Sequence, residues 1–453
     1  MTRRSTLHPE IRRRHRRACR AAWTVVVVVV AATSIAAQLM VGRGGRIAAE
    51  ATGDANMAEG ATVLTSMQLI FVGLSVVVAL STVAALVVAS RARDHGLWRA
   101  QGMRPGLLRM ILLGQLALVG AGSAIVAIPL AYPLSFPLSA FEGSVGMILP
   151  TARPQPHPVD LLILLLLCTS LTVLGGRGAA RRSSGAQIIA LLNEHDDVRG
   201  RSRRVRRRLL RGILIAVCLA GLIALPIIAQ ITESDHESIF TLVIGAGLAA
   251  LVLMVVLTPR VTPALERTWT ALFPSRSVAW HMARHSAAYE AGRSSATVMP
   301  FSLAIGLVGF AFGIRALGGN ADVGGFIALF GTAFLVAWTG GVAVIAMSAG
   351  RRRRDGALLM AAGGVQAQVR WAQVLEGVIH AVTAAILGVA STVVGLCSES
   401  LILGFNPVPV VFLHGPWVEI LAITGASLLT VCGATVLSSA STTPVAQLLR
   451  ARD

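Results

Sequence analysis

The amino-acid sequence predicts an all-α polytopic membrane protein. Of its 453 residues, 55% are hydrophobic and only 13% are charged, which leaves more apolar surface than one water-soluble core can bury. Apolar runs of about 20 residues, the length that crosses a hydrocarbon layer of roughly 30 Å, recur along the chain. These runs lack the alternation of apolar and polar residues that a membrane barrel requires, so helices remain as the structure that satisfies their backbone groups in lipid.

Ten apolar runs are expected to cross the membrane. They cover residues 21–42, 67–90, 110–132, 159–174, 212–231, 239–257, 299–317, 325–348, 372–396 and 417–437. The first run follows an arginine-rich start, but it is too long for a typical signal-peptide core and lacks a convincing cleavage site. We therefore interpret it as a retained helix.

The distribution of arginine predicts which side each loop occupies, because short arginine-rich loops stay in the cytoplasm. Eight arginines precede Ala21, eleven lie within 177–211, and four are consecutive at 351–354. The loop between the fifth and sixth spans, 232–238, instead carries three acidic residues and no arginine. We therefore expect a multi-pass protein of the cell membrane with both termini in the cytoplasm.

The net charge of +19 comes from arginine alone, since none of the 40 basic residues is lysine. The arginines lie in blocks beside apolar spans, so we interpret them as cytoplasmic anchors and expect no nucleic-acid partner. A Walker A loop needs a lysine on the nucleotide phosphates. The chain is therefore not expected to be a conventional ATPase. No Ser/His/Asp or Cys/His set can be argued from the spacing of these residues either, so no enzyme of another kind is expected.

Two loops separated by 261 positions resemble each other. Residues 93–102 lead into the third span and residues 354–363 lead into the ninth. The shared residues are Arg93, Asp94, Leu97, Ala100 and Gly102 in the first loop, and Arg354, Asp355, Leu358, Ala361 and Gly363 in the second. Each loop is expected to form a short amphipathic helix, with an acid at its start, where the helix dipole favours negative charge, and a glycine at its end. The alternative is an arginine-rich turn that only sets topology.

These motifs together resemble the FtsX-like, MacB-type permeases of ABC transporters, in which a segment ending in Leu-Arg-Ala-Leu-Gly joins the second and third helices of a four-helix unit. Arg99 completes the motif in the first loop, whereas Met360 stands at that position in the second. A tail resembling the one that follows such a unit is formed by Pro444, Val445, Ala446 and Leu448. The resemblance implies two four-helix units, 21–192 and 299–453. A basic tail, 1–20, precedes them, and a basic loop, a two-helix insert and a linker, together 193–298, lie between them.

The resemblance also implies a function. The chain would be the transmembrane subunit of an ABC transporter, coupled to a separate ATPase through Arg93, Asp94, Leu97, Arg99, Gly102, Arg354, Asp355, Leu358 and Gly363. Two ATPase subunits would bind each chain and hold ATP and magnesium, while this chain holds no cofactor. Family members generally carry a large external domain, but the outer loops here are short. The cargo is therefore expected to be hydrophobic or amphipathic, such as a peptide antibiotic or a lipid, and to be exported from the membrane.

Two other functions stay open, a signalling permease that acts on an envelope partner or sensor kinase, and an ion-coupled secondary transporter. Glu376 and His380 lie on one face of the ninth span, where polar residues are expected to face protein or water. Both a structural pairing and a proton relay are compatible with this spacing. His281 and His285 are also four residues apart, but Met282 replaces the glutamate of the HExxH metal signature, so no metal site is expected.

Two outer segments, 133–150 and 401–413, are unusually apolar for loops. Either they lie partly in the outer leaflet, or they flank an exit for the cargo.

Overall fold

The computed structural model describes residues 9–185, 201–231, 236–273, 277–289, 291–317 and 323–439. Within these ranges the regular structure is entirely helical, and ten helices are long and apolar enough to cross a membrane. The predicted fold class is confirmed. The tail residues Pro444, Val445, Ala446 and Leu448, the end of the first unit at 186–192, part of the acidic loop at 232–235 and the first eight residues lie outside the described ranges.

Nine of the ten predicted spans each lie within one long helix, and the seventh, 299–317, extends one residue beyond its helix. These helices are α1 (Pro9–Thr52), α2 (Ala55–Ser90), α4 (Pro105–Ser144), α5 (Pro158–Gly185), α7 (Arg201–Ile231), α8 (His236–Ala271), α10 (Ala291–Ala316), α11 (Val323–Ala361), α12 (Gln366–Ile402) and α14 (Trp417–Ser439). Within the described ranges, three short helices connect them, namely α3 (Ala92–Ala100), α9 (Val278–Tyr289) and α13 (Pro407–His414).

Two segments that were expected to be outer loops are largely helical. Between the first two spans, α1 and α2 extend toward each other and leave only a tight turn, in which Gly53 has a φ of +77° and the Asp54 side chain accepts the Met57 N–H at 3.0 Å. The prediction of a loop at 133–150 was also wrong for residues 133–144, because α4 continues to Ser144 through Pro133 and Pro137. Proline is tolerated in membrane helices when neighbouring groups satisfy the freed backbone.

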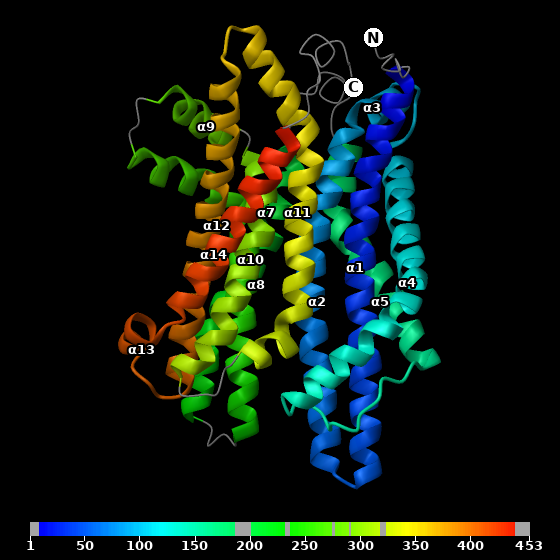
Figure 1. The fold of residues 1–453 in the computed structure, drawn as a ribbon, viewed down its shortest axis with the longest axis vertical. Coiled ribbons are helices and arrows are strands. Elements are labelled where there is room, and N and C mark those ends of the chain that lie inside the picture. Colours follow the sequence, from blue (N-terminus) through cyan, green and yellow to red (C-terminus); the bar gives the residue numbers. More distant parts are fainter. Residues whose placement is uncertain are drawn as a thin grey trace, which may run out of the picture.

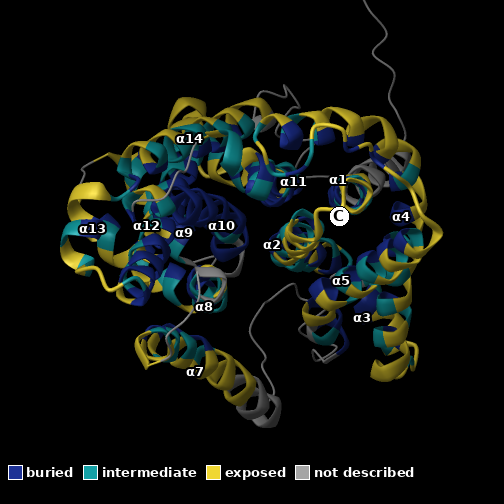
Figure 2. Ribbon diagram, turned by 90° about the horizontal axis from the view of Figure 1, so that it is seen from below, coloured by how far each residue is buried: buried dark blue, intermediate teal, exposed yellow. Residues whose placement is uncertain are grey.

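The helices form two groups that meet along α2 and α11 (Figures 1 and 2). One group contains α1, α2, α4 and α5, and the other contains α8, α10, α11, α12 and α14, with α7 outside it. In α10, 94% of the most apolar stretch of the helix is buried. In α7, only 11% of the corresponding stretch is buried. The core therefore lies around α10, whereas α7 is peripheral.

Close packing and polar contacts both join the two groups. A Cβ atom on Gly340 of α11 would lie 2.5 Å from the Cβ atom of Ala79 on α2, so only glycine permits this approach. The amide of Gln68 on α2 donates to Glu142 of α4 at 3.0 Å and to the carbonyl oxygen of Ala328 on α11 at 2.8 Å. These side chains fix the relative positions of α2, α4 and α11.

Candidate functional site

The first of the two similar loops forms α3, as expected. Asp94 lies in its first turn and Arg99 in its last turn, so both charges complement the helix dipole. The helix ends before Gly102, whose φ of +94° is a conformation that favours glycine. Arg104 is extended, and Pro105 then begins α4. The side chain of Arg93 lies outside the described part of the chain.

The second loop is not a separate helix, and this expectation was wrong. Arg354, Asp355 and Leu358 lie in the last turns of α11, which continues without a break to Ala361. Asp355 is therefore inside a helix rather than at its start. The helix continues through the four consecutive arginines that precede Asp355, whereas in the first loop it breaks at Arg91. The predicted terminal glycine is confirmed, because Gly363 has a φ of +97°.

Despite this difference, the two turns are built alike. We call residues 92–104 the first elbow and residues 354–365 the second elbow. In each elbow, three backbone N–H groups donate to carbonyl oxygens at equivalent positions. The pairs are Gln101–Leu97, Gly102–Arg99 and Met103–Trp98 at 3.0, 3.1 and 3.1 Å, and Ala362–Leu358, Gly363–Met360 and Gly364–Leu359 at 3.0, 3.1 and 2.9 Å. The elbows lie at the same end of the molecule, here called the elbow end (Figure 1).

Each elbow also exposes two large apolar side chains at equivalent positions. Leu97 and Leu358 are 48% and 52% exposed, and Trp98 and Leu359 are each 38% exposed. Both pairs lie in the last turns of their helices, beside the turn itself. Large exposed apolar side chains grouped at one place are typical of contact surfaces for another molecule.

His95 fixes the first elbow to the bundle. It is buried, its Nδ1 atom lies 2.9 Å from the Ser183 hydroxyl of α5, and its ring packs on Trp98 with 5.7 Å between centroids. Burial lowers the pKa of His95 by disfavouring the imidazolium, and Arg91 lowers it further, while Asp94 acts in the opposite direction. Sequence reasoning missed this residue, since its partner lies 88 positions away.

In the second elbow, a close helix–helix contact takes the place of that hydrogen bond. A Cβ atom on Gly356 would lie 3.1 Å from both the Gln373 amide nitrogen and a Val369 methyl group of α12. Gln373 in turn donates to the carbonyl oxygen of Arg352 at 3.1 Å. The end of α11 is thus packed directly on the start of α12.

Glu376 and His380 belong to a larger buried group, which we call the polar cluster. Its buried members are Glu266 of α8, Ser294 of α10, and Glu376 and His380 of α12, and the half-buried Ser286 of α9 completes it. His380 Nδ1 lies 3.0 Å from a Glu266 oxygen, and its Nε2 lies 3.6 Å from a Glu376 oxygen. The Ser286 hydroxyl donates to Glu376 at 3.2 Å, and that of Ser294 donates to Glu266. The cluster joins four helices beneath the second elbow.

His281 and His285 lie on α9 with ring centroids 4.4 Å apart. Within the described ranges, no group of three or more His, Cys, Asp or Glu side chains could hold a metal ion.

The ten apolar helices define a multi-pass membrane protein. Residues 66–188, which run from α2 through the first elbow to α5, match the family model for the FtsX-like permease C-terminal domain. This segment is thus an FtsX-like permease domain, and the resemblance found in the sequence is confirmed. The family indicates the membrane permease component of an ABC transporter, a non-catalytic subunit whose usual partners are ABC ATPases. No curated protein matches the chain.

Proposed function

We propose that this chain is a permease that binds two ATPase subunits, one at each elbow, and exports a hydrophobic or amphipathic cargo. The elbow end is then cytoplasmic, and with it both termini of the chain. ATP-driven closure of the two ATPases moves the elbows, and the spans on either side of each elbow carry that movement across the cell membrane.

The observation that carries this proposal is the pair of equivalent exposed side chains on the elbows. Leu97 and Trp98 on one elbow, and Leu358 and Leu359 on the other, have nearly equal exposures at positions separated by 261 residues. Two copies of the same ATPase would present two identical surfaces to the permease. Equivalent apolar side chains beside identically bonded turns fit that requirement.

The contact between the helix groups supports the same arrangement. Ala79 and Gly340 are also 261 positions apart, and they touch each other. In a two-fold symmetric pair, a residue near the axis contacts its own equivalent. We infer that a pseudo-two-fold axis passes between α2 and α11, with units 21–192 and 299–453 on either side.

The contacts that would carry movement from an elbow to the membrane spans differ between the two units. His95 ties the first elbow to α5, so a push on α3 reaches α5 as well as α2 and α4. The second elbow is continuous with α11 and packs on α12, and the polar cluster connects α12 to α8, α9 and α10.

The nature of the cargo follows from the short connections at the end opposite the elbows. The longest described connection there, 145–157, has thirteen residues, which is too few for a folded binding domain. A water-soluble cargo would have no such domain to receive it, whereas a membrane-dissolved cargo reaches the helices directly. Proline-rich α13 and the end of α4 flank this end and remain candidates for the exit.

The test is to place charges on both elbows. The double variant Leu97→Asp and Leu358→Asp should insert and fold normally, because both side chains are already half exposed. Loss of an interface hot spot costs about 2 kcal/mol of binding free energy, or roughly 30-fold in affinity. We expect the ATPase to stop co-purifying with this variant and its activity to lose stimulation by the permease.

Leu272→Asp is the matched control, since Leu272 follows α8 and is 76% exposed but lies outside both elbows. It should retain the ATPase. Undiminished co-purification with the double variant would refute the proposed docking site.

A further inference from the structure

Glu399 lies in an unusual position near the end of α12 opposite the elbows. Its side chain is buried, with 1% of the residue exposed, and neither carboxylate oxygen has a hydrogen-bond partner. An ionised carboxylate is very unfavourable in an apolar interior unless a counter-charge or several hydrogen bonds compensate it. Intramembrane ionisable residues without an evident structural partner are by default candidates for function.

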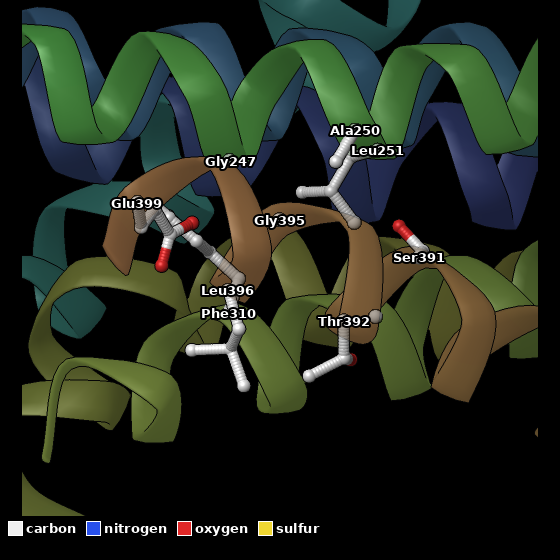
Figure 3. A pocket seen from close by; sticks show the side chains of 10 residues that line it. Gly247, Ala250, Leu251, Phe310, Ser391, Thr392, Gly395, Leu396 and Glu399 are labelled. Carbon is white, nitrogen blue, oxygen red and sulfur yellow. The ribbon is translucent and has the colours of Figure 1, made fainter. Parts of the chain in front are cut away.

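A small cavity adjoins this carboxylate, between α8, α10 and α12. It is lined by Gly247, Ala250, Leu251, Gly306, Phe310, Ser391, Thr392, Gly395, Leu396 and Glu399. Figure 3 shows the Glu399 carboxylate at one end of the cavity and Ser391 at the other. The Ser391 hydroxyl is also buried and without a hydrogen-bond partner. Two unpartnered polar side chains thus line the same cavity.

Glycine on each of the three helices creates this space. A Cβ atom on Gly247 would lie 2.0 Å from the Phe310 ring, and one on Gly306 would lie 2.8 Å from Leu251. A Cβ atom on Gly395 would lie 3.3 Å from Oε1 of Glu399. The cavity is about 10 Å³ in volume, and a space of roughly this size holds a single water molecule.

Among the described residues, none of the titratable side chains near the cavity forms a salt bridge with Glu399. The lining residues of α8 and α10 carry no titratable group. Arg315 of α10 and Glu419 of α14 pair with each other. On α7, Cys218 packs in an apolar cluster with α8, and on α13, His414 lies 3.3 Å from the Pro409 carbonyl oxygen. Cys397 on α12 is the remaining titratable neighbour in sequence.

The ligand that suits this site is a proton. Coordination of a metal cation needs several oxygen atoms around one point, but Ser391 and Glu399 are eight residues apart, or about 12 Å along the helix. The Thr392 hydroxyl already donates to the carbonyl oxygen of Gly388 at 3.0 Å. A proton needs only the carboxylate itself.

We propose that Glu399 is a proton-binding site, whose carboxyl group holds a proton while α8, α10 and α12 are packed together and releases it to water when they separate. In that step the carboxyl O–H bond breaks, and a water molecule that enters the cavity accepts the proton. Glu399 lies one turn from the end of α12, so the proton has a short path to the solvent.

Helix α7 is placed to control this exchange. The Ser398 hydroxyl donates to the Leu222 carbonyl oxygen of α7 at 2.9 Å, and Gln230 of α7 donates to the Leu401 carbonyl oxygen at 3.4 Å. These two bonds hold α7 over the last turns of α12. Since α7 is the least buried span, its displacement exposes this region at little cost to the core.

The test is infrared spectroscopy of the purified chain in lipid vesicles, at a series of pH values. We expect a carboxylic-acid C=O stretching band in the wild type at neutral pH that is lost in Glu399→Gln. Glu419→Gln, which removes a partly exposed and paired carboxylate, should leave the band unchanged. Absence of any Glu399-dependent acid band at neutral pH, as for an ionised carboxylate that binds a metal cation, would overturn the proposal.

Thermal unfolding gives a second readout. As the pH rises and the proton is lost, the melting temperature of the wild type should fall, and this fall should be absent in the neutral isostere Glu399→Gln. Parallel melting curves for the two proteins at every pH would also contradict the proposal. Both measurements use the permease alone, so their outcome is independent of ATPase binding at the elbows.

Discussion

His95 and Gly356 occupy equivalent positions in the two elbows, 261 residues apart, yet they fix their helices by different means. His95 bonds to Ser183 of α5, and Gly356 allows α12 to approach closely. The first elbow is therefore held by a titratable group, whereas the second is held by packing. Protonation of His95 should therefore act on the first elbow.

The pKa of His95 is lowered in the folded state, chiefly by burial. The unfolded value is about 6.5, so its contribution to stability is present above that pH and is lost as the pH falls through the folded value. We expect the permease to lose its stimulation of the ATPase progressively in mildly acidic buffer. His95→Gln, which retains a polar side chain but does not titrate, should flatten this part of the pH profile. An unchanged acidic limb in His95→Gln would contradict the assignment.

At the scale of elements, α12 is the rigid member that joins the second elbow to the polar cluster. Glu376 lies ten residues after the start of α12 at Gln366, which is about 15 Å along the helix. His380 stands one turn further, between carboxylates from two helices. Since the cluster is buried, removal of the His380 imidazole leaves the Glu266 and Glu376 carboxylates close together without the group that lies between them.

His380→Ala should therefore destabilise the protein strongly. Breaking a buried pair by removing one partner costs roughly 3–5 kcal/mol, which chemical unfolding in detergent can measure. His414→Ala is the matched control, because His414 lies on the exposed surface of α13 and its loss should change stability by less than about 0.5 kcal/mol. Equal stability of the two variants would show that the cluster contributes nothing to the fold.

The sequence predicted the existence of these elements better than their ends or their partners. Hydropathy located each of the ten spans. Helices α1, α2 and α4 extend beyond their apolar runs through polar and small residues, which hydropathy does not identify as helical. The segment around Gly53 was therefore expected to be a loop rather than the turn of a helical hairpin. Glu376 and His380 share a face by their spacing alone. Glu266 and Ser294 could not be foreseen, because tertiary packing brings them from α8 and α10.

At the scale of the whole molecule, the two helix groups meet through helices that occupy the same place in each proposed unit. Helices α2 and α11 are the second spans of units 21–192 and 299–453. Phe71 of α2 packs edge-on against Phe330 of α11 at 4.8 Å between centroids, and Ala79 touches Gly340. The repeated elbow was readable in the sequence, but this contact was not, because apolar residues on many faces of a membrane helix look alike.

Gly340→Leu should push α2 and α11 apart. Overpacking of a close contact costs typically about 1–3 kcal/mol, and here the Cβ atom alone would lie 2.5 Å from Ala79. We expect a lower melting temperature and loss of ATPase stimulation, even though both elbows are intact. Gly425→Leu on α14, where a Cβ atom meets nothing within 4 Å, should leave both properties unchanged. Full stimulation in Gly340→Leu would argue against communication through this contact.

The central claim, that each chain binds one ATPase subunit at each elbow, is tested most directly by native mass spectrometry of the purified complex. The wild type should carry two ATPase subunits per permease chain. Leu97→Asp alone and Leu358→Asp alone should each carry one, and the double variant should carry none. A wild-type complex with a single ATPase, or two ATPases retained by both single variants, would contradict the claim.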